Sequence, residues 1–249
     1  KDILRFHAIY WPAMLMSGGL PLPDRVFVHG FLTKDGQKMS KSLGNTIDPV
    51  ELVSYYGADA VRYYFMKEID FGRDGDFNET RFIHILNADL ADVFGNLLNR
   101  TLSMAHKYCG GKVPNLSGED IPAENPLKAI GLTLRSQVAE AYDAIAFSHA
   151  CEAILALIRL GNKYIDEQAP WTLYKQGNQQ ALEQVLYAVL ESVRLGAYLL
   201  SPIIPGISND IYQQLGFATN FNDKTKVAVS EPFALHADWG ILPSGQTLD

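Results

Sequence analysis

Apolar residues recur at helical spacing along most of the chain after residue 78. Positions three and four apart fall on one face of a helix, so each such stretch has an apolar side that needs a partner. The pattern predicts helices over 78–107, 127–142, 148–168, 179–200 and 202–215, a surface loop over 110–125, and a loosely organised tail over 218–249 packed back on the helices. Four or five antiparallel helices with short links are typical of a helix bundle.

The first 76 residues have a mixed pattern. We expect helices over 3–16, 49–56 and 58–67, a short strand at 26–28, and an acidic link over 70–76. Asp35-Gly36 is a tight-turn signal, and Asp48-Pro49 supplies the cap and first-turn residues of a helix. Arg62, in the third helix, could answer acidic neighbours or lie in solvent. The change of pattern predicts two domains, 1–76 and 77–249.

Composition narrows the class of protein. With 249 residues the chain can form one large domain or two small ones, and no apolar run reaches membrane-spanning length. The net charge of −7 argues against a general nucleic-acid binder, so any RNA contact must be local. Cys109 and Cys151 form no metal-binding pair, and we expect free buried thiols in a reducing compartment.

A cationic stretch, Lys38-Met39-Ser40-Lys41-Ser42, follows the expected turn and has a glycine on each side. Lysine is a compact charge on a flexible stem, and serine hydroxyls with backbone N–H groups can complete a phosphate cradle. In a water-poor cleft such a loop could stabilise the charge that develops as pyrophosphate leaves. The alternative is a solvated Lys/Ser surface loop.

That five-residue string resembles the signature loop of class I aminoacyl-tRNA synthetases. Its surroundings are similar to the methionyl-tRNA synthetase subgroup over residues 1 to about 215, including 2–7, 10–15, 28–30 and 57–64. The resemblance implies a mainly α chain, in which 1–76 are the C-terminal edge of a Rossmann-type catalytic domain and 77–249 an antiparallel helical anticodon-binding domain. It implies catalytic roles for Lys38 and Lys41, and ATP contacts for Lys41, Ser40, Ser42, His29, Gly30 and Asp2. Asp2 could equally cap a helix.

Ile3, His7 and Trp11 stand four apart and share one helix face. An aliphatic group, a polar ring and an aromatic wall could close over a thioether, because sulfur sits favourably against aromatic rings. The resemblance implies that these residues line the methionine pocket. From the pattern alone, an ordinary core stripe with a satisfied histidine remains the alternative.

Asn96 and Arg100 are also four apart, and Ala169-Pro170-Trp171 follows the end of an expected helix. Asn offers a donor and an acceptor for a base edge, Arg offers a planar fork, and Trp can stack on an unpaired base. The resemblance implies that Asn96, Arg100, Pro170 and Trp171 contact the CAU anticodon. The alternatives are a core amide, a surface ion pair, and an indole that closes the bundle end.

The implied function is therefore ATP-dependent joining of methionine to tRNA(Met), with Mg²⁺ accompanying ATP. No His-Ile-Gly-His-type motif occurs, so we expect a C-terminal piece of a longer enzyme, with any zinc in the half that precedes it. A bacterial-type cytoplasmic location is expected, with an organelle as the alternative. Two other functions stay open: an isolated, non-catalytic anticodon-binding module, and another class I synthetase, such as one for cysteine or leucine.

Overall fold

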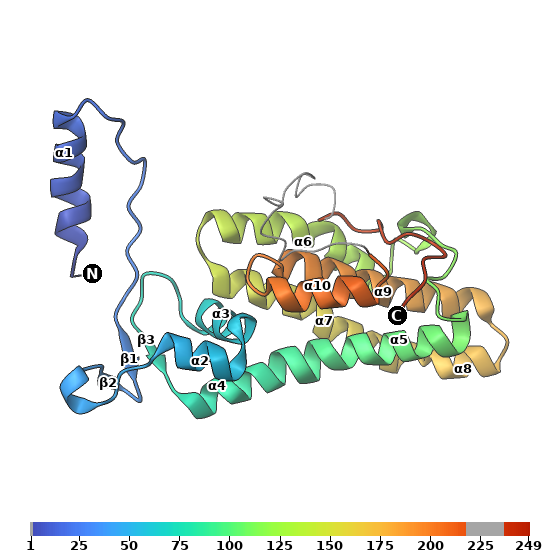
Figure 1. Cartoon of the computed structure of the whole chain (residues 1–249). Coiled ribbons are helices and arrows are strands. Elements are labelled where there is room, and N and C mark those ends of the chain that lie inside the picture. The colour runs from blue at the N-terminus through green and yellow to red at the C-terminus, as the bar shows by residue number, and fades with distance from the viewer. Residues whose placement is uncertain (1, 218–236) are drawn as a thin grey trace.

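The computed structural model describes residues 2–217 and 237–249, and most of it is helical (Figure 1). Its first part comprises η1 (Phe6–Tyr10, a π-helical segment), α1 (Trp11–Ser17), β1 (Leu32–Lys34), β2 (Gln37–Lys38), η2 (Lys41–Leu43), α2 (Pro49–Tyr56), α3 (Ala58–Glu68) and β3 (Gly75–Phe77). The second part comprises α4 (Glu79–Ile85), η3 (Leu86–Gly95), α5 (Asn96–Cys109), η4 (Gly118–Asp120), α6 (Pro126–Asp143), α7 (Phe147–Gln168), α8 (Pro170–Lys175), α9 (Gln179–Leu200) and α10 (Pro205–Gln214). No helix in these described ranges is long and apolar enough to cross a membrane.

A small sheet of order β2-β1-β3 carries the lysine-rich loop. β1 and β2 form a hairpin whose turn residues, Asp35 and Gly36, have φ values of 52° and 73°. Two successive positive φ values are those of a type I′ turn, which matches the twist of the strands. The predicted turn is confirmed. The strand expected at 26–28 is wrong, because β3 offers its parallel pairing to Leu32–Lys34 instead.

Local signals at helix ends were predicted correctly. The carboxylate of Asp48 accepts hydrogen bonds from the backbone N–H groups of Val50 and Glu51, and Pro49 opens α2. Gly57, between α2 and α3, has a φ of 84°, which a residue with a side chain rarely adopts. These signals need only neighbouring residues, which is why the sequence reveals them.

One long helix joins the two parts of the chain. α4, η3 and α5 follow one another without a break from Glu79 to Cys109, and the Asn78 side chain caps the start by accepting from the N–H of Arg81. About 30 residues at 1.5 Å each give a length of roughly 45 Å. Figure 1 shows this helix running from the sheet to the far end of the bundle. The prediction of a long helix over 78–107 is confirmed.

Helix α9 is the centre of the bundle. Every residue from Val185 to Ala197 is buried, so this helix is enclosed on all sides. It packs on α5, α6, α7, α8 and α10. The predicted bundle is therefore confirmed, although the sequence pattern did not reveal the short helix α8.

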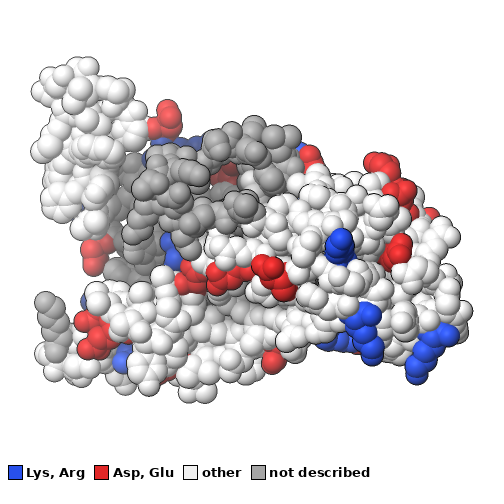
Figure 2. All heavy atoms as spheres, turned by 45° about the vertical axis from the view of Figure 1, so that its right-hand side comes forward, with Lys and Arg blue, Asp and Glu red and all other residues white. Residues whose placement is uncertain are grey.

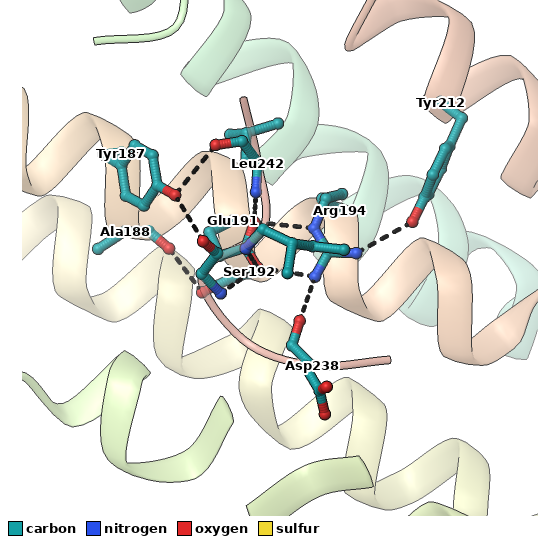
Figure 3. A network of polar contacts seen from close by, with 10 residues as sticks. Tyr187, Ala188, Glu191, Ser192, Arg194, Tyr212, Asp238 and Leu242 are labelled. Atoms are coloured by element: carbon teal, nitrogen blue, oxygen red, sulfur yellow. Dashed lines mark hydrogen bonds and ion pairs between the residues drawn. The ribbon is translucent and has the colours of Figure 1, made fainter. Parts of the chain in front are cut away.

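A buried ion pair on α9 holds the C-terminal segment (Figure 3). Arg194 donates to both carboxylate oxygens of Glu191 at 2.8 and 2.7 Å, and to the carbonyl oxygen of Asp238 at 2.7 Å. Glu191 also accepts from the backbone N–H groups of Gly240 at 2.6 Å and Leu242 at 3.2 Å. The described end, 237–249, thus packs back on the bundle as predicted, whereas 218–236 of the expected tail lie outside the described residues.

Helix α3 is bonded to the break between α9 and α10. Arg62 donates to the carbonyl oxygens of Ile203 at 2.8 Å and Pro202 at 2.7 Å. One turn earlier, Asp59 accepts from the N–H of Ile207 at 2.7 Å. The expected exposure of Arg62 to solvent is confirmed, whereas its bonds go to the free carbonyls after a helix end and not to acidic side chains.

We predict that Arg194→Met lowers the free energy of unfolding by about 3–5 kcal/mol, because it leaves the Glu191 carboxylate buried without its partner. Urea denaturation measures this change. The control is Arg135→Met, which removes an exposed ion pair with Asp238 and should cost less than about 1 kcal/mol. Equal stability of the two variants would contradict the role given to the buried pair.

Candidate functional site

The lysine-rich loop is closed by one asparagine. The side-chain oxygen of Asn45 accepts from the N–H of Ser40 at 2.8 Å, and its amide nitrogen donates to the carbonyl oxygen of Lys38 at 3.2 Å. The N–H of Leu43 donates to the carbonyl oxygen of Ser40 at 3.1 Å, which forms the single turn η2. Asn45 therefore fixes the two ends of the loop. Its role was missed from the sequence, where it is only the residue after a glycine.

Two polar side chains of this loop are open to solvent. Lys38 and Ser42 are exposed and Ser40 is half-buried, and the two serine hydroxyl oxygens lie 2.8 Å apart. The backbone of Lys41 lies in η2. Lysine ammonium groups and serine hydroxyls are suitable donors for a phosphate anion. The side chains of the loop contribute no carboxylate that would oppose such an anion.

Glycine is required at position 30 by the close packing of two backbone segments. A Cβ atom there would lie 1.9 Å from the carbonyl oxygen of Arg73, so only glycine allows the two backbones to approach. Next to it, the N–H of Phe31 donates to Asp74 at 2.8 Å. The exposed ring of His29 lies with its Nδ1 2.8 Å from the carbonyl oxygen of Gly30. These contacts set the base from which the hairpin and the loop project.

The candidate methionine-binding residues lie on one helix face, as the spacing predicts. Nδ1 of His7 is 3.0 Å from the carbonyl oxygen of Ile3, and the rings of His7 and Trp11 meet edge to face at 6.4 Å. This face is open: Ile3 is 61% and Trp11 43% exposed. Figure 1 shows α1 standing apart from the sheet and the bundle. The structure therefore does not bring these residues, or the exposed Asp2, together with the loop.

The four candidate RNA-binding residues lie on α5 and on the chain after α7. Arg100 of α5 donates to Asp166 of α7 at 2.5 Å, so its guanidinium is held at this end of the bundle. Asn96, one turn before Arg100, is exposed. Pro170 is buried at the first position of α8, while Trp171 beside it is 40% exposed. The indole is thus partly open to solvent, and the surface ion pair considered for Arg100 is present.

A reversal at Ala169 sets the direction of α8. Ala169 has a φ of 44° and a ψ of 66°, a left-handed conformation that ends α7. Its carbonyl oxygen accepts from the N–H of Thr172 at 2.7 Å, which starts α8 at once. A six-residue helix is too short for an apolar period, so the sequence pattern could not reveal it. The sequence did not reveal Asp166 either, because nothing in its position along α7 distinguishes it from the other residues of that helix.

Charge is unevenly distributed over the visible face. Figure 2 shows acidic side chains near the middle of the view and basic side chains at its lower right, with further acidic side chains above these. In Figure 1 the C-terminal end of α5 and helix α8 lie on that side. A local basic region agrees with a polyanion contact on a chain of net charge −7.

The cysteines offer no reactive thiolate. Both are free, with Cys151 buried and Cys109 half-buried, so the predicted free thiols are confirmed and full burial holds for one of them. Burial raises the pKa of Cys109 to about 11 and that of Cys151 to about 12. Both thiols are protonated at neutral pH, which makes them poor nucleophiles.

Comparisons with known proteins agree with this arrangement. Residues 1–102 match the family model described as class I tRNA synthetases (M), and residues 113–237 match the anticodon-binding domain of methionyl tRNA ligase. A methionine–tRNA ligase of Nostoc sp. is 66% identical over 248 residues, which is 100% of this chain and 46% of the relative. A ligase of Synechocystis sp. is 60% identical, covering 100% of this chain and 47% of the relative.

A solved structure gives the same result. The Mycobacterium tuberculosis methionyl-tRNA synthetase in complex with methionyl-adenylate superimposes with a TM-score of 0.85 at 40% identity, over 99% of this chain and 47% of that one. The matches define a class I aminoacyl-tRNA synthetase fold, in which part of a Rossmann-type domain precedes an anticodon-binding domain. Within that class, the chain belongs to the methionyl-tRNA synthetase family. It spans about half the length of the curated relatives it matches.

We predict that Asn45→Ala speeds hydrogen exchange of the Ser40 amide by roughly an order of magnitude, because the amide loses its acceptor. Global stability should change little, since the loop lies at the surface. Amide exchange resolved by residue measures both. The matched control is Asn87→Ala on η3, which removes an exposed asparagine far along the chain from the loop. Identical Ser40 exchange in the two variants would contradict the closing role of Asn45.

Proposed function

We propose that this chain is part of a methionine–tRNA ligase and supplies the lysine-rich loop and the reading of the tRNA anticodon. The proposal rests on two family matches: one, over residues 1–102, includes the loop and most of the first long helix, and the other, over 113–237, includes α6 to α10 of the bundle. Residues 1–76 would complete the catalytic domain, and 77–249 would form the anticodon-binding domain. The start of the long helix at Glu79 supports a boundary near this point.

In the complete enzyme, methionine and ATP would form methionyl-adenylate and pyrophosphate, and the methionyl group would then pass to tRNA(Met). Lys41 would stabilise the charge on the departing pyrophosphate, with Lys38 positioning the loop. Ser40 and Ser42, together with His29, Gly30 and Asp2, would complete the ATP contacts. The adjacent serine hydroxyls support this role: one donates to the other at 2.8 Å, and the hydroxyl that accepts keeps its own proton for a phosphate oxygen.

Methionine would bind against Ile3, His7 and Trp11. The support is the shared helix face together with its exposure, since an apolar helix face left open to solvent indicates an interaction site. We propose that the remaining half of the catalytic domain covers this face and forms the other wall of the pocket. Aromatic rings beside a thioether are a favourable arrangement.

Mg²⁺ would accompany the phosphates of ATP. In the described ranges 2–217 and 237–249, no cluster of three or more His, Cys, Asp or Glu side chains could hold a metal ion. Because Mg²⁺ commonly binds through substrate phosphates, water and one or two carboxylates, the nucleotide would supply most of its ligands.

Asn96, Arg100, Pro170 and Trp171 would contact the CAU anticodon. The support is the Arg100–Asp166 bond, which orients a planar guanidinium at the end of the bundle that carries an exposed indole. A guanidinium and an indole together provide hydrogen bonding and stacking for unpaired bases. A bacterial-type cytoplasm is the proposed location. An organelle is the alternative, because a relative from Arabidopsis thaliana, 47% identical over 255 residues, is named chloroplastic/mitochondrial.

A second candidate function is RNA binding without catalysis. It is favoured by the open face of α1 and by the separation of α1 from the loop. Both candidate functions share the anticodon contact and differ in whether the chain activates methionine. The family match leaves the cysteine and leucine alternatives without support.

We predict that Trp171→Ala weakens binding of an anticodon stem-loop with a CAU loop by about 1–3 kcal/mol, the usual loss for one base-stacking contact. Fluorescence anisotropy with labelled RNA measures the affinity. Trp11→Ala is the matched control, because Trp11 is exposed to a similar degree on α1, away from the bundle end. Unchanged binding by Trp171→Ala would refute the assignment of the RNA site.

We predict no measurable ATP–pyrophosphate exchange with methionine by this chain alone, because the methionine face and the loop are not brought together. The assay follows labelled pyrophosphate entering ATP. Robust exchange would contradict the proposal that the chain needs the other half of the catalytic domain.

A further inference from the structure

Helix α8 carries a second exposed aromatic ring. Tyr174 lies three residues after Trp171 and is 51% exposed, while Trp171 is 40% exposed. Residues three apart lie on the same side of a helix, about 4.5 Å apart along its axis. That separation resembles the spacing between neighbouring bases of a partly splayed single strand. The outward side of α8 therefore offers two aromatic rings in a row.

The ring of Tyr174 is held in place by a partner from α5. It lies against the ring of Tyr108, with centroids 4.6 Å apart and an angle of 32° between the planes. Tyr108 is half-buried at the end of α5, so the pair is anchored in the bundle. A ring that is already ordered loses little conformational entropy when a ligand stacks on it.

A cation lies beside this aromatic pair. The Nζ atom of Lys107 is 5.3 Å from the centre of the Tyr108 ring. Lys107 has no ion-pair partner in the part of the chain that the structure describes. Its charge is therefore available to an anion that approaches the rings. Stacking rings next to a free cation are the combination that binds a base and its phosphate.

We propose that Tyr174, backed by Tyr108, is a stacking platform for an unpaired nucleotide that flanks the anticodon in the same RNA loop. Lys107 binds the phosphate of that nucleotide. This site rests on the proposed anticodon-binding function and extends it beyond the three bases assigned to Asn96, Arg100, Pro170 and Trp171. RNA is favoured over a protein partner because Tyr174 lies next to Trp171 on α8 and because the cation Lys107 lies beside the tyrosine pair.

The test compares variants in the binding of labelled CAU stem-loop RNA. We expect Tyr174→Ala to weaken binding roughly 5- to 150-fold, and Tyr174→Phe to stay within about twofold, because the ring and not the hydroxyl makes the contact. Lys107→Gln should reduce the salt dependence of binding by about one phosphate contact. The matched control is Tyr55→Ala on α2, where the tyrosine is 84% exposed and also lies against a tyrosine ring.

A 2-aminopurine placed beside the anticodon gives a direct readout of stacking. Its fluorescence should be quenched when the RNA binds the unchanged chain and Tyr174→Phe, and should recover in Tyr174→Ala. If Trp171→Ala weakens binding while Tyr174→Ala behaves like Tyr55→Ala, the Tyr174 site is refuted and the anticodon function stands. If neither variant weakens binding, the anticodon function itself fails. Equal losses in Tyr174→Phe and Tyr174→Ala would refute stacking as the contact.

Discussion

The structure depends on the bonds between α3 and the break that separates α9 from α10. A break between two helices leaves carbonyl and N–H groups without partners, and burying such groups is costly. Arg62 and Asp59 supply partners for both kinds of group. The Arg62 guanidinium donates to the carbonyl oxygens of Pro202 and Ile203, and the Asp59 carboxylate accepts from the N–H of Ile207. The segment that follows the lysine-rich loop is thereby joined to the core of the bundle.

A second connection, the long first helix of the bundle, links the sheet to the end of the bundle that carries α8. The long helix from Glu79 to Cys109 leaves the small sheet and ends beside α8 (Figure 1). With α3 bonded at one end and α5 packed on α9, the loop and the end of the bundle that carries α8 belong to one frame. The buried Glu191–Arg194 pair adds the C-terminal segment to the same frame. The proposed phosphate and base contacts would then lie far apart on supports that do not move independently.

Features encoded by neighbouring residues could be predicted from the sequence. The bundle helices follow from apolar spacing, the hairpin from Asp35-Gly36, and the start of α2 from Asp48-Pro49. Features that depend on distant partners could not. The strand forms at Leu32–Lys34 because its partner is β3, some forty residues later, and the partners of Arg62 lie about 140 residues away. The Tyr108–Tyr174 contact has no local signal either.

The candidate sites divide in the same way. The shared face of Ile3, His7 and Trp11 is a matter of helical spacing and is present, but the pocket around it needs residues from elsewhere. The Arg100–Asp166 bond joins two helices and holds the Arg100 side chain in place. The sequence motif contains Arg100 but does not reveal this partner.

The measurement that tests the central claim most directly is the hydrogen-exchange footprint of a CAU stem-loop on this chain. The account predicts slower exchange confined to 96–109 and 166–175, with 38–47 unchanged. Protection centred on 38–47 or on α2 and α3, or no protection at all, would contradict it.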